Sequence, residues 1–172
     1  KEYSLLEYLM LNTGRAERRP EVGWVFSDLY LTDEEGKVTG RWSERLHYFR
    51  RQLRGQIFGE LLMGNFIPVH AVMVRRACLN EVGGFDETLP NQEDHDLWLR
   101  LSRRFLVEYL DVPLGYYRRG PKSMSTDRMA MAVVAFKIME RLEREFPAEV
   151  QAKGDAWRRL KAKREAEMLI QA

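Results

Sequence analysis

The chain has 172 residues, of which 45% are hydrophobic and 31% are charged, a composition typical of a globular domain rather than of a disordered or fibrous chain. Its formal net charge of +2 is too small to favour a protein that coats nucleic-acid phosphates, so we expect no nucleic-acid partner. No apolar run approaches the roughly 20 residues of a membrane span, and the single cysteine, Cys78, excludes a disulfide framework, so we expect a cytoplasmic protein.

The first third of the chain predicts helix, strand and helix. Residues 2–19 have apolar side chains near helical spacing. Residues 22–32, rich in aromatic and β-branched types, predict a strand, and Gly36 can form the turn after it. Apolar residues at helical spacing predict a second helix over 43–63, with Ser43 as its cap.

Residues 41–54 are rich in arginine, with Glu44 as their only acid. An amphipathic helix with this composition can lie on an anionic membrane, and peripheral membrane contact is one interpretation. Ordinary packing of its apolar stripe against a sheet is the other. His47 is expected to face solvent on the same helix.

The middle of the chain predicts short elements. Residues 67–75 have the composition of a short buried strand, and His70 within it is expected to be a hydrogen-bonded core residue. A brief helix should end at the glycine pair 83–84, and residues 85–92 are too polar for regular structure. Cys78 is expected to be a small buried apolar residue.

The last part of the chain predicts further helices around one strand. Residues 94–105 resume helical periodicity, and residues 107–118 alternate as a strand or hairpin that Pro113 interrupts. From Asp127 onward two helices are expected, broken near Pro147. Helices interleaved with strands predict an α/β fold.

Residues 81–96 contain six acids and no Lys or Arg, and the last acids coincide with the start of a predicted helix. Asp94 is expected at or near the helix cap, where backbone N–H groups favour its ionised form. A positioned carboxylate of this kind can act as a general base, and Glu93 or Asp96 would raise a pKa within the cluster by like-charge repulsion. The alternative is that Asp94 only caps a helix. His95, between two acids, is expected to be a surface residue.

Several segments match known motifs in the right order. They are Gly23 to Asp33 with Glu35-Gly36, Asn65-Phe66-Ile67-Pro68, Val72 to Arg76, Glu81 to Glu87, Glu93 to Leu101, Pro113 to Arg118, and Ser123-Met124-Ser125. Together these segments, covering about residues 20–126, resemble family 2 glycosyltransferases, and Glu93-Asp94 resembles that family's acidic signature.

The resemblance implies a GT-A fold and transfer of a sugar, with inversion, from a nucleotide-diphosphate sugar to an acceptor hydroxyl. It implies that Asp94 is the catalytic base and that Glu93 helps to orient the site. It implies that Asp96 and Trp98 shape the acceptor pocket. A divalent metal, Mg or Mn, is expected in the full enzyme.

The sequence departs from the family at the metal motif. No Asp-x-Asp precedes Val22, and the one in the chain, residues 94–96, belongs to the acidic signature. Gly120 stands where many family members have a histidine. We therefore expect residues 1–126 to be the acceptor-side half of a GT-A domain, a partial mixed sheet flanked by helices, and residues 127–172 to be a helical extension. This half is expected to bind no metal, to bind nucleotide sugar weakly or not at all, and to be inactive alone.

Two further interpretations stay open. Arg118 and Arg119, at the end of a strand, can grip a diphosphate or form salt bridges to the acidic loop. A half-domain would also leave a sheet edge unpaired, so the alternative to an enzyme is a non-catalytic interaction module that associates with itself or with another chain.

Overall fold

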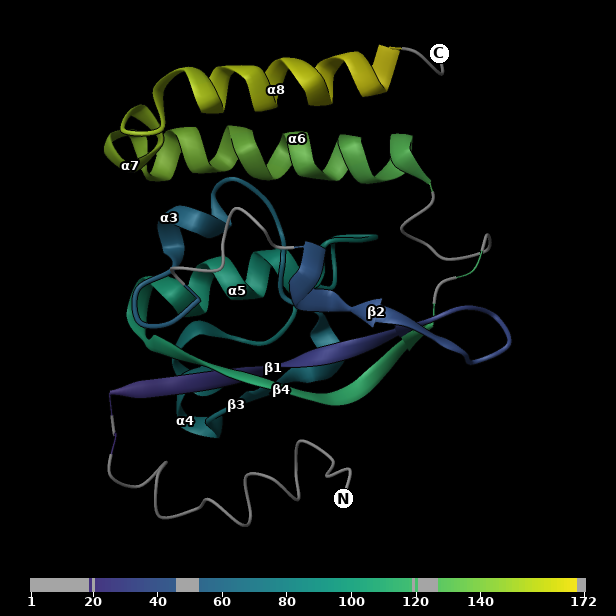
Figure 1. Cartoon of the computed structure of the whole chain (residues 1–172). Helices are drawn as coiled ribbons and strands as arrows, with labels where there is room; N and C mark the ends of the chain where they lie inside the picture. The colour runs from purple at the N-terminus through teal and green to yellow at the C-terminus, as the bar shows by residue number, and fades with distance from the viewer. Residues whose placement is uncertain (1–18, 20, 46–52, 119, 121–126, 170–172) are drawn as a thin grey trace.

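The computed structural model describes residues 19, 21–45, 53–118, 120 and 127–169 (Figure 1). The strands are β1 (Val22–Thr32), β2 (Val38–Arg41), β3 (Val72–Val74) and β4 (Leu106–Arg118). The helices are α3 (Phe58–Leu61), α4 (Arg76–Val82), α5 (Glu93–Arg104), α6 (Arg128–Glu145), α7 (Pro147–Gln151) and α8 (Gly154–Leu169), with 3₁₀ turns η1 (Trp42–Arg45) and η2 (Val69–Ala71). The protein has an α/β fold, as predicted.

β1 is the centre of a mixed four-stranded sheet. It pairs in parallel with β4 along its whole length, from Val22 opposite Leu106 to Thr32 opposite Arg118. On its other side it pairs antiparallel with β3 near its start and with β2 near its end. Its predicted bounds, 22–32, are confirmed. Both faces of the strand are buried, one by Trp24 and Phe26 and the other by Leu29 and Leu31.

β4 runs through Pro113 as one strand rather than as a hairpin. Ser27 pairs with Leu110 and the next residue, Asp28, pairs with Pro113, so the two residues between them on β4 form a bulge. A proline is tolerated here because β4 lies at an edge of the sheet, where a missing N–H breaks no ladder.

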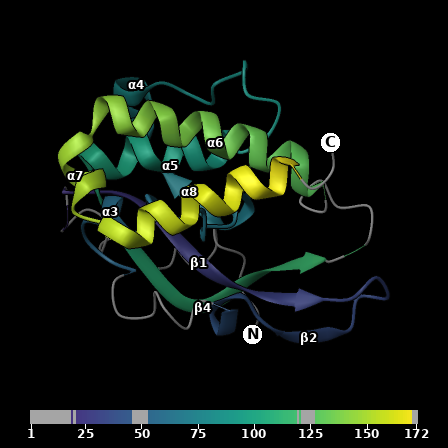
Figure 2. The ribbon, with the colours of Figure 1, turned by 90° about the horizontal axis from the view of Figure 1, so that it is seen from above.

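The helices α5, α6 and α8 form layers over one face of the sheet, and α4 lies on the other side of it (Figures 1 and 2). α5 covers the sheet, and α6 and α8 lie side by side above α5. Trp98 of α5 stacks on Trp24 of β1, with ring centroids 5.4 Å apart. One continuous core joins sheet, α5 and the C-terminal helices, because Ile138 of α6 and Trp157 of α8 belong to the same buried cluster as Trp24. The helical character after Asp127 and the break near Pro147 are confirmed, but the region has three helices rather than two, because the short α7 lies between α6 and α8.

The predicted helix over 43–63 is wrong as one continuous helix, because in the part that the structure describes only α3 (Phe58–Leu61) is α-helical. Gly55, with φ +80°, exchanges two backbone hydrogen bonds with Val107 of β4, which a helix at this position would prevent. Leu53 and Ile57 are nevertheless buried, so apolar residues at helical spacing reach the core from an irregular segment. Ser43 caps no helix, because its N–H and hydroxyl both donate to Asp28.

The helix predicted at 2–19 and the position predicted for His47 lie outside the described residues, apart from residue 19. The strand expected over 67–75 is shorter, since η2 occupies its first part and β3 only Val72–Val74. The short helix ending at Gly83, the Gly36 turn and the irregular 85–92 segment are confirmed. No helix in the described ranges is long and apolar enough to cross a membrane.

Candidate functional site

α5 begins after a left-handed residue. Gln92, with φ +57°, is the cap position, and Asp94 is therefore inside the first turn rather than at the cap. The loop before α5 is held against α6, since the Gln92 amide donates to the Met131 carbonyl at 2.5 Å and the Asn91 amide donates to the Ala130 carbonyl at 3.3 Å. The N-terminal end of α5 is thus positioned by α6.

The Asp94 carboxylate is half-buried and held on both oxygens. Asn65 Nδ2 donates to Oδ2 at 2.9 Å, and the His95 backbone N–H donates to Oδ1 at 2.7 Å. Asn65 is itself fixed, because its Oδ1 accepts from the Ile67 N–H at 3.1 Å. The asparagine therefore aims the carboxylate from the segment that precedes η2.

Burial raises the pKa of Asp94, and the charge of Glu93 adds to the increase, while the hydrogen bonds from His95 and Asn65 oppose it. A carboxylate with a raised pKa is a stronger base than an exposed one. The like-charge effect expected from the sequence is present for Glu93, but burial is the larger cause.

Asp96 has a different environment, although it is only two residues away. Its side chain is 1% exposed, and its oxygens bind Arg100 of the same helix and Arg141 of α6. Arg100 Nε lies 2.8 Å from Asp96 Oδ2. The structure places this carboxylate in a buried ion-pair network that joins α5 to α6.

Trp98 is also in the core. It is 2% exposed, stacks on Trp24, and donates from Nε1 to the Ile67 carbonyl at 3.3 Å. The indole ring of Trp98 fills the space between α5 and β1. Glu93, Asp94, Asp96 and Trp98 thus share one helix, but the structure brings only the first two together as candidates for chemistry.

Arg118 is exposed at the last position of β4, opposite Thr32. Within the described ranges it forms no ion pair with the acidic loop, so the salt-bridge interpretation has no support there. Arg119 lies outside the described residues.

The two described histidines are placed opposite to expectation. His95 is 6% exposed, and its Nε2–H donates to the Leu61 carbonyl at 2.8 Å while its Nδ1 has no partner. Burial lowers the pKa of His95 to about 4, so the ring is neutral. His70 is exposed and stacks on Tyr117. The surface prediction for His95 and the core prediction for His70 are both wrong. His70 is exposed because residues 69–71 turn in η2 instead of continuing β3, whereas the His95 side chain points from α5 toward Leu61 in the core.

Cys78 is buried as predicted, and burial raises the pKa of its thiol. A thiol with a raised pKa is a poor nucleophile near neutral pH.

A second buried carboxylate, Asp28 of β1, was not singled out by the sequence. It accepts from Leu29 N–H, from Arg41 Nε and from the N–H and hydroxyl of Ser43, at 2.6–2.9 Å. A cavity of about 220 Å³ adjoins this network, with Arg41, Ser43 and Tyr109 in its wall. Because Arg41 belongs to β2 and Ser43 to η1, the network stabilises the junction of β1, β2 and η1.

The described residues contain no group of three or more His, Cys, Asp or Glu side chains that could hold a metal ion. The acidic signature does not form such a group, because Asp96 faces arginines and His95 faces the core. The described residues of the acidic signature therefore do not fit a divalent-metal site.

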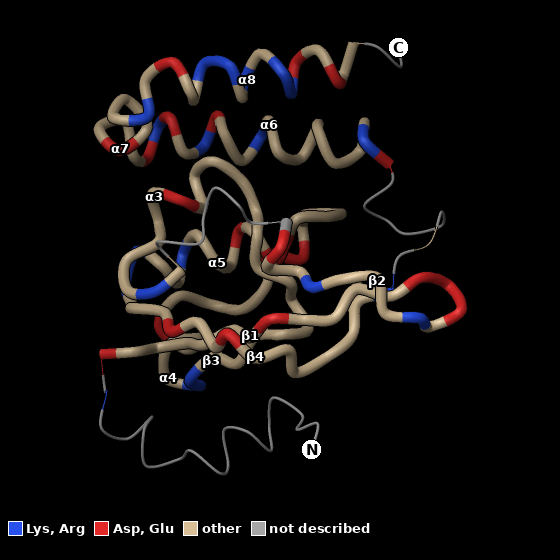
Figure 3. The backbone as a smooth tube through the Cα atoms, in the orientation of Figure 1, with Lys and Arg blue, Asp and Glu red and all other residues tan. Residues whose placement is uncertain are grey.

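Sequence reasoning missed two parts of this region. Asn65 stands out in the sequence only as part of the motif Asn65-Phe66-Ile67-Pro68. Nothing in its local sequence indicates contact with Asp94, 29 positions later. The basic residues on α6 and α8 that surround Gln92 were also missed, although the density of Lys and Arg along α8 was a visible signal (Figure 3).

Comparison with protein-family models and with curated proteins found no match for this chain.

Proposed function

We propose that this chain is the acceptor-side part of an inverting, nucleotide-sugar-dependent glycosyltransferase, with Asp94 as the general base. The observation that carries the proposal is the hydrogen bond from Asn65 to a half-buried Asp94 whose pKa is raised. The order of the motifs along residues 20–126 supports the same conclusion.

Asp94 would accept the proton of the acceptor hydroxyl as the hydroxyl oxygen forms a bond to the anomeric carbon. The bond from that carbon to the diphosphate breaks at the same time, and its electron pair leaves with the nucleoside diphosphate. Attack and departure on opposite faces invert the configuration. Glu93 would contribute by raising the pKa of its neighbour, and Asn65 by keeping the carboxylate aimed.

The proposal requires donor-binding residues from polypeptide that this sequence does not include. A divalent metal, if used, would be bound by those residues. Arg118 is exposed and has no ion pair in the described part of the chain, so it is available to a diphosphate from that side.

The test is sugar transfer by the longest polypeptide that contains this sequence, assayed over a panel of nucleotide sugars and acceptors. Asp94→Asn keeps the shape and an oxygen for Asn65, and is expected to lower kcat by about 10²–10⁴-fold. Glu87→Gln, an exposed carboxylate in the neighbouring loop, is the matched control and should leave kcat unchanged. Unchanged transfer by Asp94→Asn would remove the base role.

Self-association is a second candidate, favoured by the outer edge of β4. Among the described residues this edge has one partner, the bridge from Val107 to Gly55. Open edges pair with other strands, although the bulge before Pro113 shortens the regular part available. Size-exclusion chromatography with light scattering tests this candidate, and a monomer at high micromolar concentration would reject it.

A further inference from the structure

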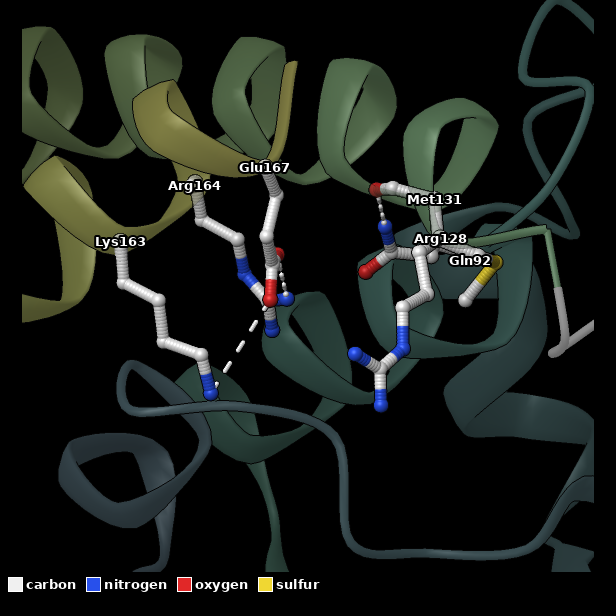
Figure 4. Close-up of a pocket in the computed structure, with 6 residues that line it drawn as sticks. All are labelled: Gln92, Arg128, Met131, Lys163, Arg164 and Glu167. Carbon is white, nitrogen blue, oxygen red and sulfur yellow. Dashed lines mark hydrogen bonds and ion pairs between the residues drawn. The ribbon is translucent and has the colours of Figure 1, made fainter. Parts of the chain in front are cut away.

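A cavity of about 260 Å³ lies where the N-terminal end of α5 meets α6 and α8. Its wall consists of Gln92, Arg128, Met131, Lys163, Arg164 and Glu167 (Figure 4). One water needs only about 10–15 Å³ of such space, so the cavity has room for a small polar ligand. The wall combines residues from the start of α5, from α6 and from α8.

The cavity is strongly basic. Glu167 is its only carboxylate, and it lies 2.8 Å from Arg164 and 4.0 Å from Lys163. Ion pairs between residues three or four positions apart are common on helices, and they explain why Lys163, Arg164 and Glu167 lie together on α8. They do not account for Arg128, which comes from the first turn of α6 and has no ion pair in the described part of the chain.

Three cations and one carboxylate leave two uncompensated positive charges around the cavity. Figure 4 shows Arg128 extending from α6 in the same direction as Lys163 and Arg164 from α8. Glu93 and Asp94, which follow Gln92, are not part of the wall. Two positive charges with guanidinium donors match a phosphate monoester, which carries a charge near −2 at neutral pH.

We propose that this cavity binds a phosphate monoester group through Arg128, Lys163 and Arg164. The group can belong to a small soluble phosphate ester or to the headgroup of a lipid such as phosphatidate. The proposal does not depend on the activity of Asp94, because the cavity wall contains neither Asp94 nor Asn65.

The test is calorimetric titration of the whole chain with inorganic phosphate and with glycerol 3-phosphate. Arg128→Gln and Lys163→Gln are each expected to weaken binding by about tenfold, because each removes a charge-assisted hydrogen bond or a nearby charge. Glu167→Gln removes the one carboxylate and is expected to tighten binding several-fold. Circular dichroism of each variant checks that the helices are intact.

Arg159→Gln is the matched control, since Arg159 is exposed on α8 and is not part of the cavity wall. It should leave the affinity unchanged. Sedimentation with vesicles of neutral lipid, with and without phosphatidate, distinguishes the two sources of the phosphate group. Sedimentation of the chain with phosphatidate vesicles, without binding to glycerol 3-phosphate, would show that the group belongs to a lipid. The proposal would be overturned if the chain bound neither the soluble phosphates nor the phosphatidate vesicles. Equal weakening of binding by Arg159→Gln and Arg128→Gln would overturn it as well.

Discussion

Arg141 of α6 forms an ion pair with Asp96 of α5, a carboxylate that is 1% exposed. Arg100 holds the other oxygen of the same carboxylate at 2.7 Å. The pair ties the helical layer above α5 to the helix that covers the sheet. A buried carboxylate with two arginines is therefore a structural element of this fold, although its sequence context predicts a binding residue.

Asp96→Asn is expected to lower the free energy of unfolding by about 3–5 kcal/mol, because it leaves two guanidinium groups without their buried counter-charge. Urea denaturation followed by circular dichroism measures the change. Asp155→Asn is the control, since its pair with Arg158 is on the surface, and its effect should be much smaller. Equal effects of the two variants would show that the Asp96 network is not stabilising.

Asn65→Ala is expected to raise the pKa of Asp94 further, because it removes a hydrogen bond that favours the ionised carboxylate. Titration of the side-chain carboxyl carbon by NMR measures the shift. Asn80→Ala, at an exposed position of α4, is the control and should not move it. An unchanged Asp94 pKa in Asn65→Ala would mean that the hydrogen bond does not persist in solution.

His95 should make the protein sensitive to acid. Its pKa is about 4 in the folded protein and near the ordinary 6.5 in the unfolded chain. Between these values the unfolded state binds more protons, so stability falls as the pH falls from about 6.5 to about 4, by about 3 kcal/mol in total.

His95→Gln keeps a donor for the Leu61 carbonyl and should remove most of this pH dependence. The measurement is the free energy of unfolding at several pH values for the wild type and the variant. His70→Gln, at an exposed position, should keep most of the slope. If His95→Gln kept the full slope, another group would be responsible.

Gly23→Ala should destabilise the start of β1. A Cβ at this position would lie 2.5 Å from Phe105 Cβ and 2.9 Å from Cys78 Sγ, too close for either to remain in place. The expected cost is about 1–3 kcal/mol, typical of overpacking, and is measured by thermal unfolding. Gly84→Ala has open space around it and is the matched control. A similar melting temperature for both variants would contradict the close contact.

Most regular elements were predictable because their signals are local. The strand at 22–32 has mostly apolar and aromatic residues, and the helix at 94–105 has clear helical periodicity. The structure of residues 43–63 was not predictable in this way, because apolar residues at helical spacing can also reach the core from an irregular segment. Only the pairing of Gly55 with β4, 52 residues later at Val107, shows that this segment is irregular.

The sequence groups Glu93, Asp94 and Asp96 in one acidic cluster but does not show which partners each acid meets. The resemblance implies a catalytic role for Asp94 and Glu93 and a place in the acceptor pocket for Asp96. The structure separates them by partners from distant segments: Asn65 for Asp94 and Arg141 for Asp96.

By itself, the sequence determined most of the helices and strands, since periodicity and turn residues act within a few positions of the chain. Tertiary structure alone decided that one carboxylate of the acidic cluster is held half-buried by an amide while another is neutralised by arginines. The pKa of each carboxylate depends on its burial and on charges within several ångströms, and those neighbours are brought there by the fold.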